Sequence, residues 1–292
     1  MHRITEKRLL APRVYLMKVE APRIAVKRKA GQFVILRVSE RGERFPLTIA
    51  DSDPAAGTIT IVFQVVGKST RDLSMLDVGD AILDVVGPLG RPTHVERFGR
   101  VVCIGGGVGI APVYPIVRAM KEAGNHVTSL ISARSRDLLI LEEEIARYSD
   151  VLVVATDDGS KGFKGFPTDI LRQMLEEGQK VDLVVAVGPV PLMRAACKVT
   201  APHRIPTVVS LNPIMVDGTG MCGGCRVTVG GQTKFVCVDG PEFDGHQVDF
   251  DLLAKRLRTY EEMERISLER ASQEECRLEP VIRAIQREDT TP

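Results

Sequence analysis

The sequence predicts a β + α/β protein: an antiparallel β-barrel, a doubly wound parallel-sheet domain, a small loop domain and a helical tail. Three observations support this. Short runs rich in β-branched residues fill the first part of the chain, and apolar strand-like runs then alternate with amphipathic helical stretches. Three of the six cysteines, with several glycines, then crowd into residues 215–237. We expect the parts to cover residues 1–98, 99–210, 211–248 and 249–292.

Composition excludes several classes of function. The 292 residues carry a net charge of only +1, which gives no electrostatic basis for binding nucleic acid or a membrane surface. No apolar run is long enough for a membrane span, and MHRITEKRLL lacks the apolar core of a signal peptide. The sequence therefore predicts a cytosolic protein, in which clustered cysteines more often bind metal or do redox chemistry than form disulfides.

The first part contains four predicted strands separated by Gly, Pro, Asp and Asn turns. Their spacing is typical of a small antiparallel barrel. The four runs are Val14–Val19, Phe33–Val38, Thr58–Val66 and Ala81–Val86.

The second part alternates strands with helices, as βαβ units around a parallel sheet do. Its strand-like runs are VVCIGG, HVTSLISA, VLVVAT and VDLVVAVG, and its helical stretches include VYPIVRAMKEAG and FPTDILRQMLEEG.

A glycine loop, VVCIGGGVGIAP, links the first of these strands to a helical pattern. Such a loop presents backbone N–H groups and a helix N-terminus to a diphosphate. The dinucleotide fingerprint G-x-G-x-x-G is incomplete, because Ile110 stands in its third glycine position; read from Gly107, the run ends at Pro112. The alternative is an ordinary tight turn. A second turn, Gly188-Pro189, also follows an apolar strand, at the kind of edge where open α/β sheets bind ligands.

The cysteine-rich stretch has the spacing D-x4-C-x2-C-x11-C, from Asp217 through Cys222 and Cys225 to Cys237. Three cysteines could belong to a structural zinc site, with His246 or Asp217 as fourth ligand. The plant-type [2Fe–2S] spacing is C-x4-C-x2-C…C, and Asp217 occupies the place of its first cysteine. A carboxylate there can bind iron; the alternative is a solvated turn aspartate.

We make separate predictions for the three remaining cysteines and for the tail. Cys103 and Cys197 fall on apolar or helical positions and are expected to be buried structural thiols, whereas Cys276 lies in the charged tail. From about Asp249 the chain is expected to form a long charged helix. Its scattered apolar residues suggest docking on its own body or on another subunit: Leu252, Leu253, Leu257, Tyr260, Met263 and Ile266.

The order of barrel and glycine loop, which reads GxGxxP, resembles the ferredoxin–NADP reductase superfamily over Met1–Val209. The resemblance implies a barrel that binds FAD through the stretches RFPLTIAD and VVGKSTRDLSML. The implied flavin-binding residues are Arg44, Pro46, Leu47, Thr48, Val65, Gly67, Lys68, Ser69 and Thr70. Leu47 replaces the family's aromatic residue, so no ring is expected to stack on the flavin from this position. GKST alone is more typical of a surface turn and lacks the upstream glycine of a P-loop.

The same resemblance implies the residues that bind NAD(P)H. They are Gly107, Val108, Gly109, Pro112, Ala133, Arg134, Asp157, Asp158, Gly188 and Pro189. Arg134 could bind a 2′-phosphate and favour NADP, or pair with nearby Glu142–Glu144. Hydride transfer to a flavin requires no acid–base side chain, so we expect no catalytic residue.

With the cysteine-rich loop included, the chain resembles the electron-transfer subunits of class B dihydroorotate dehydrogenase. That family has four cysteines at its cluster. Asp217, SLNPIMVDGTGMCGGCRV and the tail more closely resemble the small (alpha) subunits of NADH-dependent reduced ferredoxin:NADP oxidoreductase, or sulfide dehydrogenase, in which one Asp and three Cys hold the cluster. These subunits typically use NAD(H), and their partner is a larger flavoprotein with [4Fe–4S] clusters. Such a complex serves ferredoxin indirectly and can bifurcate electrons.

The sequence therefore predicts an electron-transfer subunit with FAD, a [2Fe–2S] cluster and NAD(P)H. Three alternatives stay open: a dihydroorotate dehydrogenase subunit, a stand-alone reductase and a zinc-stabilised nucleotide-binding regulator without turnover. The preferred nucleotide, the direction of electron flow and bifurcation also stay open.

Overall fold

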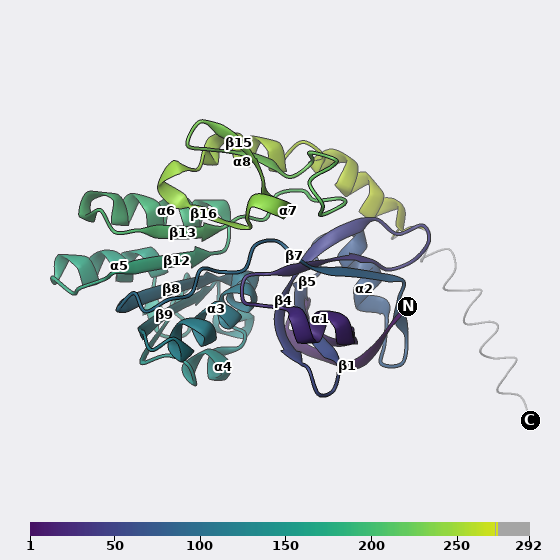
Figure 1. Cartoon of the computed structure of the whole chain (residues 1–292), viewed down its shortest axis with the longest axis horizontal. Coiled ribbons are helices and arrows are strands. Elements are labelled where there is room, and N and C mark those ends of the chain that lie inside the picture. The colour runs from purple at the N-terminus through teal and green to yellow at the C-terminus, as the bar shows by residue number, and fades with distance from the viewer. Residues whose placement is uncertain (272, 274–292) are drawn as a thin grey trace, which may run out of the picture.

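The computed structural model describes residues 1–271 and 273. Two sheets stand next to each other, the barrel sheet from the first part of the chain and a mixed sheet from the middle. Figure 1 shows the later segment, in green and yellow, lying across one side of both. The predicted order of a barrel, an α/β domain and a loop segment is confirmed.

The first sheet is an antiparallel barrel of seven strands in the order β6-β1-β2-β5-β4-β3-β7. Its interior is filled by alternating apolar side chains, including Ile49, Ile59 and Ile61, which are fully buried. The strands are β1 (His2–Ala11), β2 (Val14–Glu20), β3 (Phe33–Arg37), β4 (Arg44–Asp53), β5 (Thr58–Gln64), β6 (Ala81–Ile82) and β7 (Asp84–Leu89). Two helices accompany them, α1 (Pro22–Lys27) and α2 (Lys68–Met75).

Two of these strands were not among those predicted. β1 is largely polar and half-exposed, so no apolar run marks it. β4 contains Pro46, which reads as a turn signal but is accommodated opposite Ile35 of β3. The four predicted runs correspond to β2, β3, β5 and the pair β6–β7.

The second sheet has the order β11-β10-β9-β8-β12-β13-β16. All its pairings are parallel except β13 with β16. Its strands are β8 (Arg100–Gly106), β9 (His126–Ala133), β10 (Val151–Thr156), β11 (Phe163–Lys164), β12 (Leu183–Val187), β13 (Thr207–Ser210) and β16 (Glu242–Asp244). The chain winds outward from β8 in one direction and then from β12 in the other, so the strand order reverses between them.

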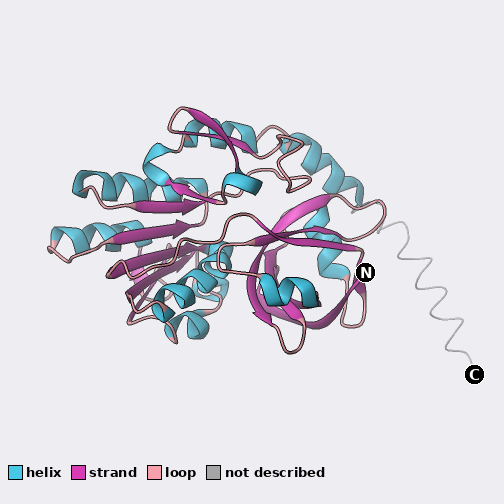
Figure 2. Ribbon diagram, viewed as in Figure 1, coloured by secondary structure: helices cyan, strands magenta, loops and turns pink. Residues whose placement is uncertain are grey.

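Helices cover both faces of this sheet, as Figure 2 shows. α3 (Ile110–Glu122) and α4 (Glu142–Ala146) share one buried cluster, while α5 (Pro167–Glu176) and α6 (Val190–Thr200) belong to another. Short 3-10 turns η1 (Gly107–Gly109), η2 (Arg136–Leu138) and η3 (Ala201–His203) complete this part. Both predicted helical stretches are confirmed, although α3 begins at Ile110, before the apolar pattern becomes regular.

The cysteine-rich segment adds a hairpin of β14 (Arg226–Val229) and β15 (Gln232–Phe235), the short helix α7 (Val236–Asp239) and the turn η4 (Gly245–Gln247). Its last strand, β16, pairs antiparallel with β13 and so extends the second sheet. One buried cluster contains Phe33 and Ile35 of the barrel together with Cys225 and Cys237, so this segment also packs against the barrel.

The tail is not one continuous helix as predicted. α8 (Phe250–Leu257) ends at a turn over residues 258–260, and a second helix covers residues 261–271. Leu253 of α8 is buried against the cysteine-rich segment and the second sheet, whereas Met263 is exposed. The turn gives the two halves of the tail different directions, so they contact different parts of the molecule (Figure 1).

Cys103 and Cys197 are buried as predicted, and burial raises their thiol pKa to about 12 and about 11. Cys276 lies outside the described residues. The described chain contains no helix with the length and apolar character needed to cross a bilayer.

An ion cluster joins the barrel to the second sheet. The Oδ1 atom of Asp51, in β4, accepts a hydrogen bond of 2.7 Å from Arg28 and forms an ion pair with Arg118 of α3 at 3.0 Å. Arg28 is almost fully buried, and its pKa is lowered by burial despite the attraction of Asp51. Because a buried cation requires a close partner, Asp51 fixes α3 against the barrel wall.

A second polar contact lies where all three parts meet. Glu242 of β16 accepts a hydrogen bond of 2.6 Å from the hydroxyl of Thr93, in the segment between the two sheets. A side chain at Gly31 of the barrel would collide with this carboxylate. Desolvation raises the pKa of Glu242 to about 7, more than the Thr93 hydrogen bond lowers it.

This elevated pKa predicts a pH-dependent loss of stability. Below about pH 4.5 the carboxyl is protonated in both the folded and the unfolded chain, whereas between pH 4.5 and 7 only the unfolded chain ionises. The free energy of unfolding should therefore fall by about 2–3 kcal/mol across that range. Glu242→Gln should remove this loss, measured by urea unfolding of the flavin-free chain at pH 5 and pH 8. The exposed Glu40→Gln is the control, and equal pH dependence in wild type and Glu242→Gln would contradict the prediction.

Candidate functional site

The glycine loop and the Gly188-Pro189 turn meet at the carboxyl edge of the second sheet. An added Cβ on Gly109 would lie 2.6 Å from the carbonyl oxygen of Val187 and 2.8 Å from Gly188 Cα. Gly107 has a left-handed φ of +57° and no atom within 4 Å of such a Cβ, so its backbone is open to an approaching group. These residues follow β8 and β12, where the strand order reverses, which is where open α/β sheets bind ligands.

The other predicted nucleotide residues lie on the same edge, further along the sheet. The Asp157 N–H donates to Ala133 O and the Asp158 N–H to Arg134 O, so the loops after β9 and β10 are tied together. The hydroxyl and N–H of Ser160 both donate to the Asp158 carboxylate and lower its pKa.

The predicted alternative of Arg134 pairing with Glu142–Glu144 is not observed. Glu142 instead pairs with Lys161 at 2.7 Å, and the ion pairs of residues 1–271 include none for Arg134. The Arg134 guanidinium is thus available to a ligand at this edge.

The two predicted flavin stretches are adjacent on the barrel. RFPLT, in β4, pairs with β3 so that Thr48 lies opposite Phe33 and Leu47 opposite Val34. GKST begins α2, whose N-terminal cap is Gly67, and the Ser69 hydroxyl donates to Glu43 at 3.1 Å, directly before β4. The structure therefore brings the start of β4 and the N-terminus of α2 together.

The charges around these stretches fit an anionic group. Arg44 is exposed and belongs to none of the ion pairs found between described residues, while Lys68 pairs only with Asp72, one turn along α2, at 2.5 Å. The first-turn N–H groups of α2 add positive potential at the same end. Thr70 caps this turn, because its Oγ1 accepts from the N–H groups of Val66 and Gly67.

Two of the predicted metal ligands are already in contact. The Sγ atoms of Cys225 and Cys237 lie 3.2 Å apart, and both residues are buried. Burial, with the hydrogen bond from Cys225, raises the Cys237 thiol pKa to about 12. Cys222 is exposed on the same loop, and its Sγ accepts from the Gly224 N–H at 3.5 Å.

Asp217 organises the loop around these cysteines. Its Oδ2 accepts a hydrogen bond of 2.9 Å from the Cys222 N–H, and its Oδ1 accepts from the hydroxyl and N–H of Thr219 at 2.6 and 2.5 Å. These donors hold the Asp217 pKa well below its usual range, so the carboxylate is ionised. Within the described residues no three His, Cys, Asp or Glu side chains yet converge as metal ligands. The donor set of three sulfurs and one carboxylate nevertheless matches iron, with Asp217 beside Cys222.

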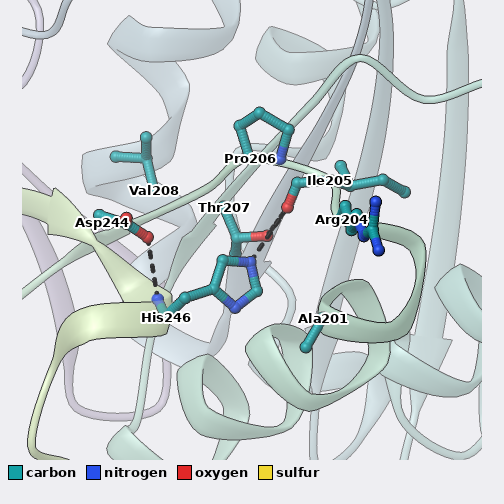
Figure 3. Close-up of a pocket in the computed structure, with 8 residues that line it drawn as sticks. All are labelled: Ala201, Arg204, Ile205, Pro206, Thr207, Val208, Asp244 and His246. Atoms are coloured by element: carbon teal, nitrogen blue, oxygen red, sulfur yellow. Dashed lines mark hydrogen bonds between the residues drawn. The ribbon is translucent and has the colours of Figure 1, made fainter.

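The structure offers no support for His246 as a zinc ligand beside these cysteines. Its Nε2 lies 3.0 Å from the carbonyl oxygen of Ile205, and its N–H donates to Asp244, at the outer edge of the second sheet (Figure 3). His246 and Asp244 line a cavity of about 710 Å³ together with Arg204 and Thr207. This cavity adjoins the amino end of β13, the opposite end from the glycine loop, so it is separate from the predicted nucleotide site.

One supporting contact escaped the sequence reading. The guanidinium of Arg256, in α8, donates to the carbonyl of Gly224 at 3.0 Å and thereby fixes the loop between Cys222 and Cys225. No local motif marks it, because the two residues are 32 positions apart. An arginine facing a glycine-rich ligand loop becomes recognisable only once the tail is folded back.

Two family models match the chain. Residues 103–198 match the oxidoreductase NAD-binding domain, and residues 212–249 match the iron-sulfur cluster binding domain of dihydroorotate dehydrogenase B. The first range contains the glycine loop and the second contains Asp217 and all three clustered cysteines.

Whole-chain comparisons agree with these matches. The chain is 51% identical over 270 residues to the dihydroorotate dehydrogenase B (NAD(+)) electron transfer subunit homolog of Thermotoga maritima, covering 92% of this chain and 95% of that protein. It is 33% identical to the electron transfer subunit of Bacillus caldolyticus dihydroorotate dehydrogenase B, covering 84% of this chain and 96% of that one. It also superposes on a chain of a solved NADH-dependent reduced ferredoxin-NADP oxidoreductase, described in connection with flavin-based electron bifurcation. The TM-score is 0.88 at 50% sequence identity, and the superposition covers 92% of this chain and 97% of that chain.

The close contact of Gly109 with the backbone of Val187 and Gly188 predicts what a methyl group added at Gly109 would do. Gly109→Ala would press on backbone atoms of Val187 and Gly188, which cannot rotate away, and should destabilise the chain by about 1–3 kcal/mol. It should also weaken NADH binding, measured by titration of the flavin-loaded chain. Gly124→Ala is the control for destabilisation alone, because its left-handed φ of +82° strains an alanine while the residue lies away from this edge, so NADH affinity should be unchanged. An unchanged NADH affinity in Gly109→Ala would contradict the assignment.

Proposed function

We propose that this chain is an oxidoreductase subunit that carries electrons between NAD(P)H, FAD and a [2Fe–2S] cluster. The chain belongs to the family of dihydroorotate dehydrogenase B electron transfer subunits and their homologues. One observation carries the proposal: a nucleotide edge and an Asp–Cys₃ loop stand next to the same flavin-type barrel. An added Cβ on Gly218, beside Asp217, would lie within 3 Å of Leu89 and Ile35 of the barrel.

Bound FAD would accept an electron pair from the nicotinamide as hydride and release electrons singly to the cluster. The contribution of the chain is to hold the three groups in order. β4 and α2 would bind the flavin, the glycine loop would bind the nucleotide diphosphate, and the loop around Cys222–Cys237 would enclose the iron. No acid–base side chain is assigned, since hydride transfer moves no separate proton.

In this assignment Gly67, Lys68, Ser69 and Thr70 would hold the flavin diphosphate, and residues of β4 would contact the ring. Arg44 supplies an unpaired cation next to them. Pro46 and Leu47 make an apolar surface for the ring, Thr48 offers a hydroxyl, and Val65 packs against the barrel interior.

The cluster would be held by Asp217, Cys222, Cys225 and Cys237. The loop keeps Asp217 ionised and Cys225 against Cys237, and all three cysteines must lose their thiol protons when they bind iron. A carboxylate is a harder ligand than a thiolate, so it will set a reduction potential different from that of a four-cysteine site.

NAD(P)H would bind through Gly107, Val108, Gly109 and Pro112, with Gly188 and Pro189 across the edge. Ala133, Arg134, Asp157 and Asp158 would hold its adenosine end. The relatives named for NAD(+) or NADH favour NADH as the working nucleotide.

We assign the chain to a complex with a larger flavoprotein subunit carrying [4Fe–4S] clusters, which would deliver electrons to or from ferredoxin. Its similarity to a chain of the reduced ferredoxin-NADP oxidoreductase supports this complex. We also expect the protein to work in the cytosol, because thiolate ligands and NAD(P)H suit that reducing compartment.

Anaerobic native purification, with metal and flavin analysis and identification of copurifying proteins, tests the function. We expect FAD, two irons per chain, reduction by NADH and a larger iron–sulfur flavoprotein partner. A partner that oxidises dihydroorotate would assign the chain to dihydroorotate dehydrogenase, and complete NAD(P)H:ferredoxin turnover by the chain alone would make it a stand-alone reductase. Colourless protein containing zinc would overturn the proposal in favour of a nucleotide-binding regulator.

Substitution of Asp217 tests the cluster ligands. Asp217→Cys should retain a [2Fe–2S] cluster but shift its midpoint potential, because a thiolate replaces a carboxylate on iron. EPR-monitored redox titration measures this shift. Thr219→Val is the control: it removes one hydrogen bond to Asp217 and leaves the ligand in place. A potential identical in Asp217→Cys and wild type would show that Asp217 does not bind iron.

A further inference from the structure

The second tail helix, residues 261–271, lies close to α2 (Figure 1). A cavity of about 390 Å³ opens between them. Lys68 lines it from α2, and the other lining residues, from the tail helix, are Met263, Ile266, Ser267, Arg270 and Ala271. Of the lining residues only Lys68 belongs to a predicted cofactor site, and the residues of the tail helix belong to none.

The lining combines two kinds of chemistry. Lys68 and Arg270 supply cations from opposite walls and Ser267 a hydroxyl, while Met263, Ile266 and Ala271 make an apolar surface. Two cations beside an apolar surface suit a ligand with both phosphate and a flat apolar ring. The cavity volume falls in the range of small-molecule sites, about 300–1,000 Å³.

The position of Lys68 connects this cavity to the flavin. Lys68 opens α2, directly after Gly67, at the helix end assigned above to the flavin diphosphate. Its own ion pair, with Asp72 one turn along α2, satisfies only part of its donor capacity. Whatever phosphate is bound at this end of α2 therefore lies at the mouth of the cavity.

The two arginines of the tail helix differ in their partners. Arg265 pairs with Glu269 one turn along at 2.6 Å. Arg270 is exposed and belongs to none of the ion pairs between residues 1–271. The helix thus satisfies one arginine internally and directs the other to the cavity shared with Lys68.

We propose that the tail helix forms the outer wall of the flavin site and that the cavity between Lys68 and Arg270 holds the adenosine diphosphate half of FAD. This inference rests on the proposed function, and it adds that the tail makes the site selective for FAD over FMN. FMN has the same ring and one phosphate but lacks the second phosphate and the adenosine. The break at residues 258–260 is what brings the tail helix over α2, while α8 stays on the cysteine-rich segment.

The test is flavin binding by the full chain. Flavin is removed, and the protein is titrated with FAD and separately with FMN, following flavin fluorescence. Arg270→Gln should raise the Kd for FAD about tenfold and leave the Kd for FMN within about twofold of wild type, since a charge-assisted hydrogen bond to phosphate is lost. Arg265→Gln, on the same helix but paired with Glu269, is the matched control and should change neither value.

The outcomes separate this inference from the proposed function. An unchanged Kd for FAD in Arg270→Gln, or equal weakening of FAD and FMN, would overturn the role of the tail helix and leave the flavin assignment standing. A wild-type chain that binds neither flavin would overturn the proposed function itself, and this inference with it. Because Arg270 is exposed, the variant should fold, and an unchanged thermal unfolding curve of the flavin-free chain verifies this.

Discussion

The antiparallel pairing of β16 with β13 is the contact on which the arrangement of the three parts depends. Residues 208–210 pair there with residues 242–244, so the segment that carries the cysteines ends as a strand of the nucleotide sheet. The same strand carries Glu242, whose carboxyl binds Thr93 next to the barrel. Without this ladder the cysteine-rich loop would be a glycine-rich appendage with few backbone partners of its own. With it, the loop is held by the sheet that presents the nucleotide and by the barrel at the same time.

Electron transfer requires fixed distances between carriers, and the packing suggests how the chain supplies them. β3 lies between the flavin stretch and the cysteine-rich loop. Phe33 of β3 pairs with Thr48, and Ile35, the next residue on the same face of β3, would contact a Cβ on Gly218. Both belong to the buried cluster that includes Cys225 and Cys237. A single apolar strand therefore separates the two proposed redox sites, and close-packed side chains leave it little freedom to move. On the other side of the barrel, the Arg28–Asp51–Arg118 cluster holds α3, and with it the glycine loop.

The sequence was most informative where local chemistry decides the structure. The alternation of strands and helices, the glycine loop and the buried thiols at Cys103 and Cys197 were all predictable, because each depends on a period or on residue type. β4 was missed because Pro46, within the flavin stretch, argues against a strand by local rules, and the barrel accommodates it through pairing with β3. The break at residues 258–260 was missed because no Gly or Pro marks it. It follows instead from α8 and the tail helix packing on different parts of the molecule. Glu242 and Arg256 were unpredictable for a related reason, since their partners are distant in sequence.

Asp217 shows what residue spacing in the sequence can identify about a site and what requires the geometry of the folded chain. Its position five residues before Cys222 is the only sequence signal that distinguishes this loop from a four-cysteine site. In the folded chain its carboxylate accepts three hydrogen bonds from its own loop, the pattern of a turn-capping aspartate. The two roles are compatible because a carboxylate has about four lone-pair positions, so three donors leave one free. Capping also keeps the group ionised and close to Cys222, as a metal ligand needs to be. A turn-capping aspartate and an iron ligand are therefore compatible roles for Asp217. The loop orders its carboxylate before iron binds.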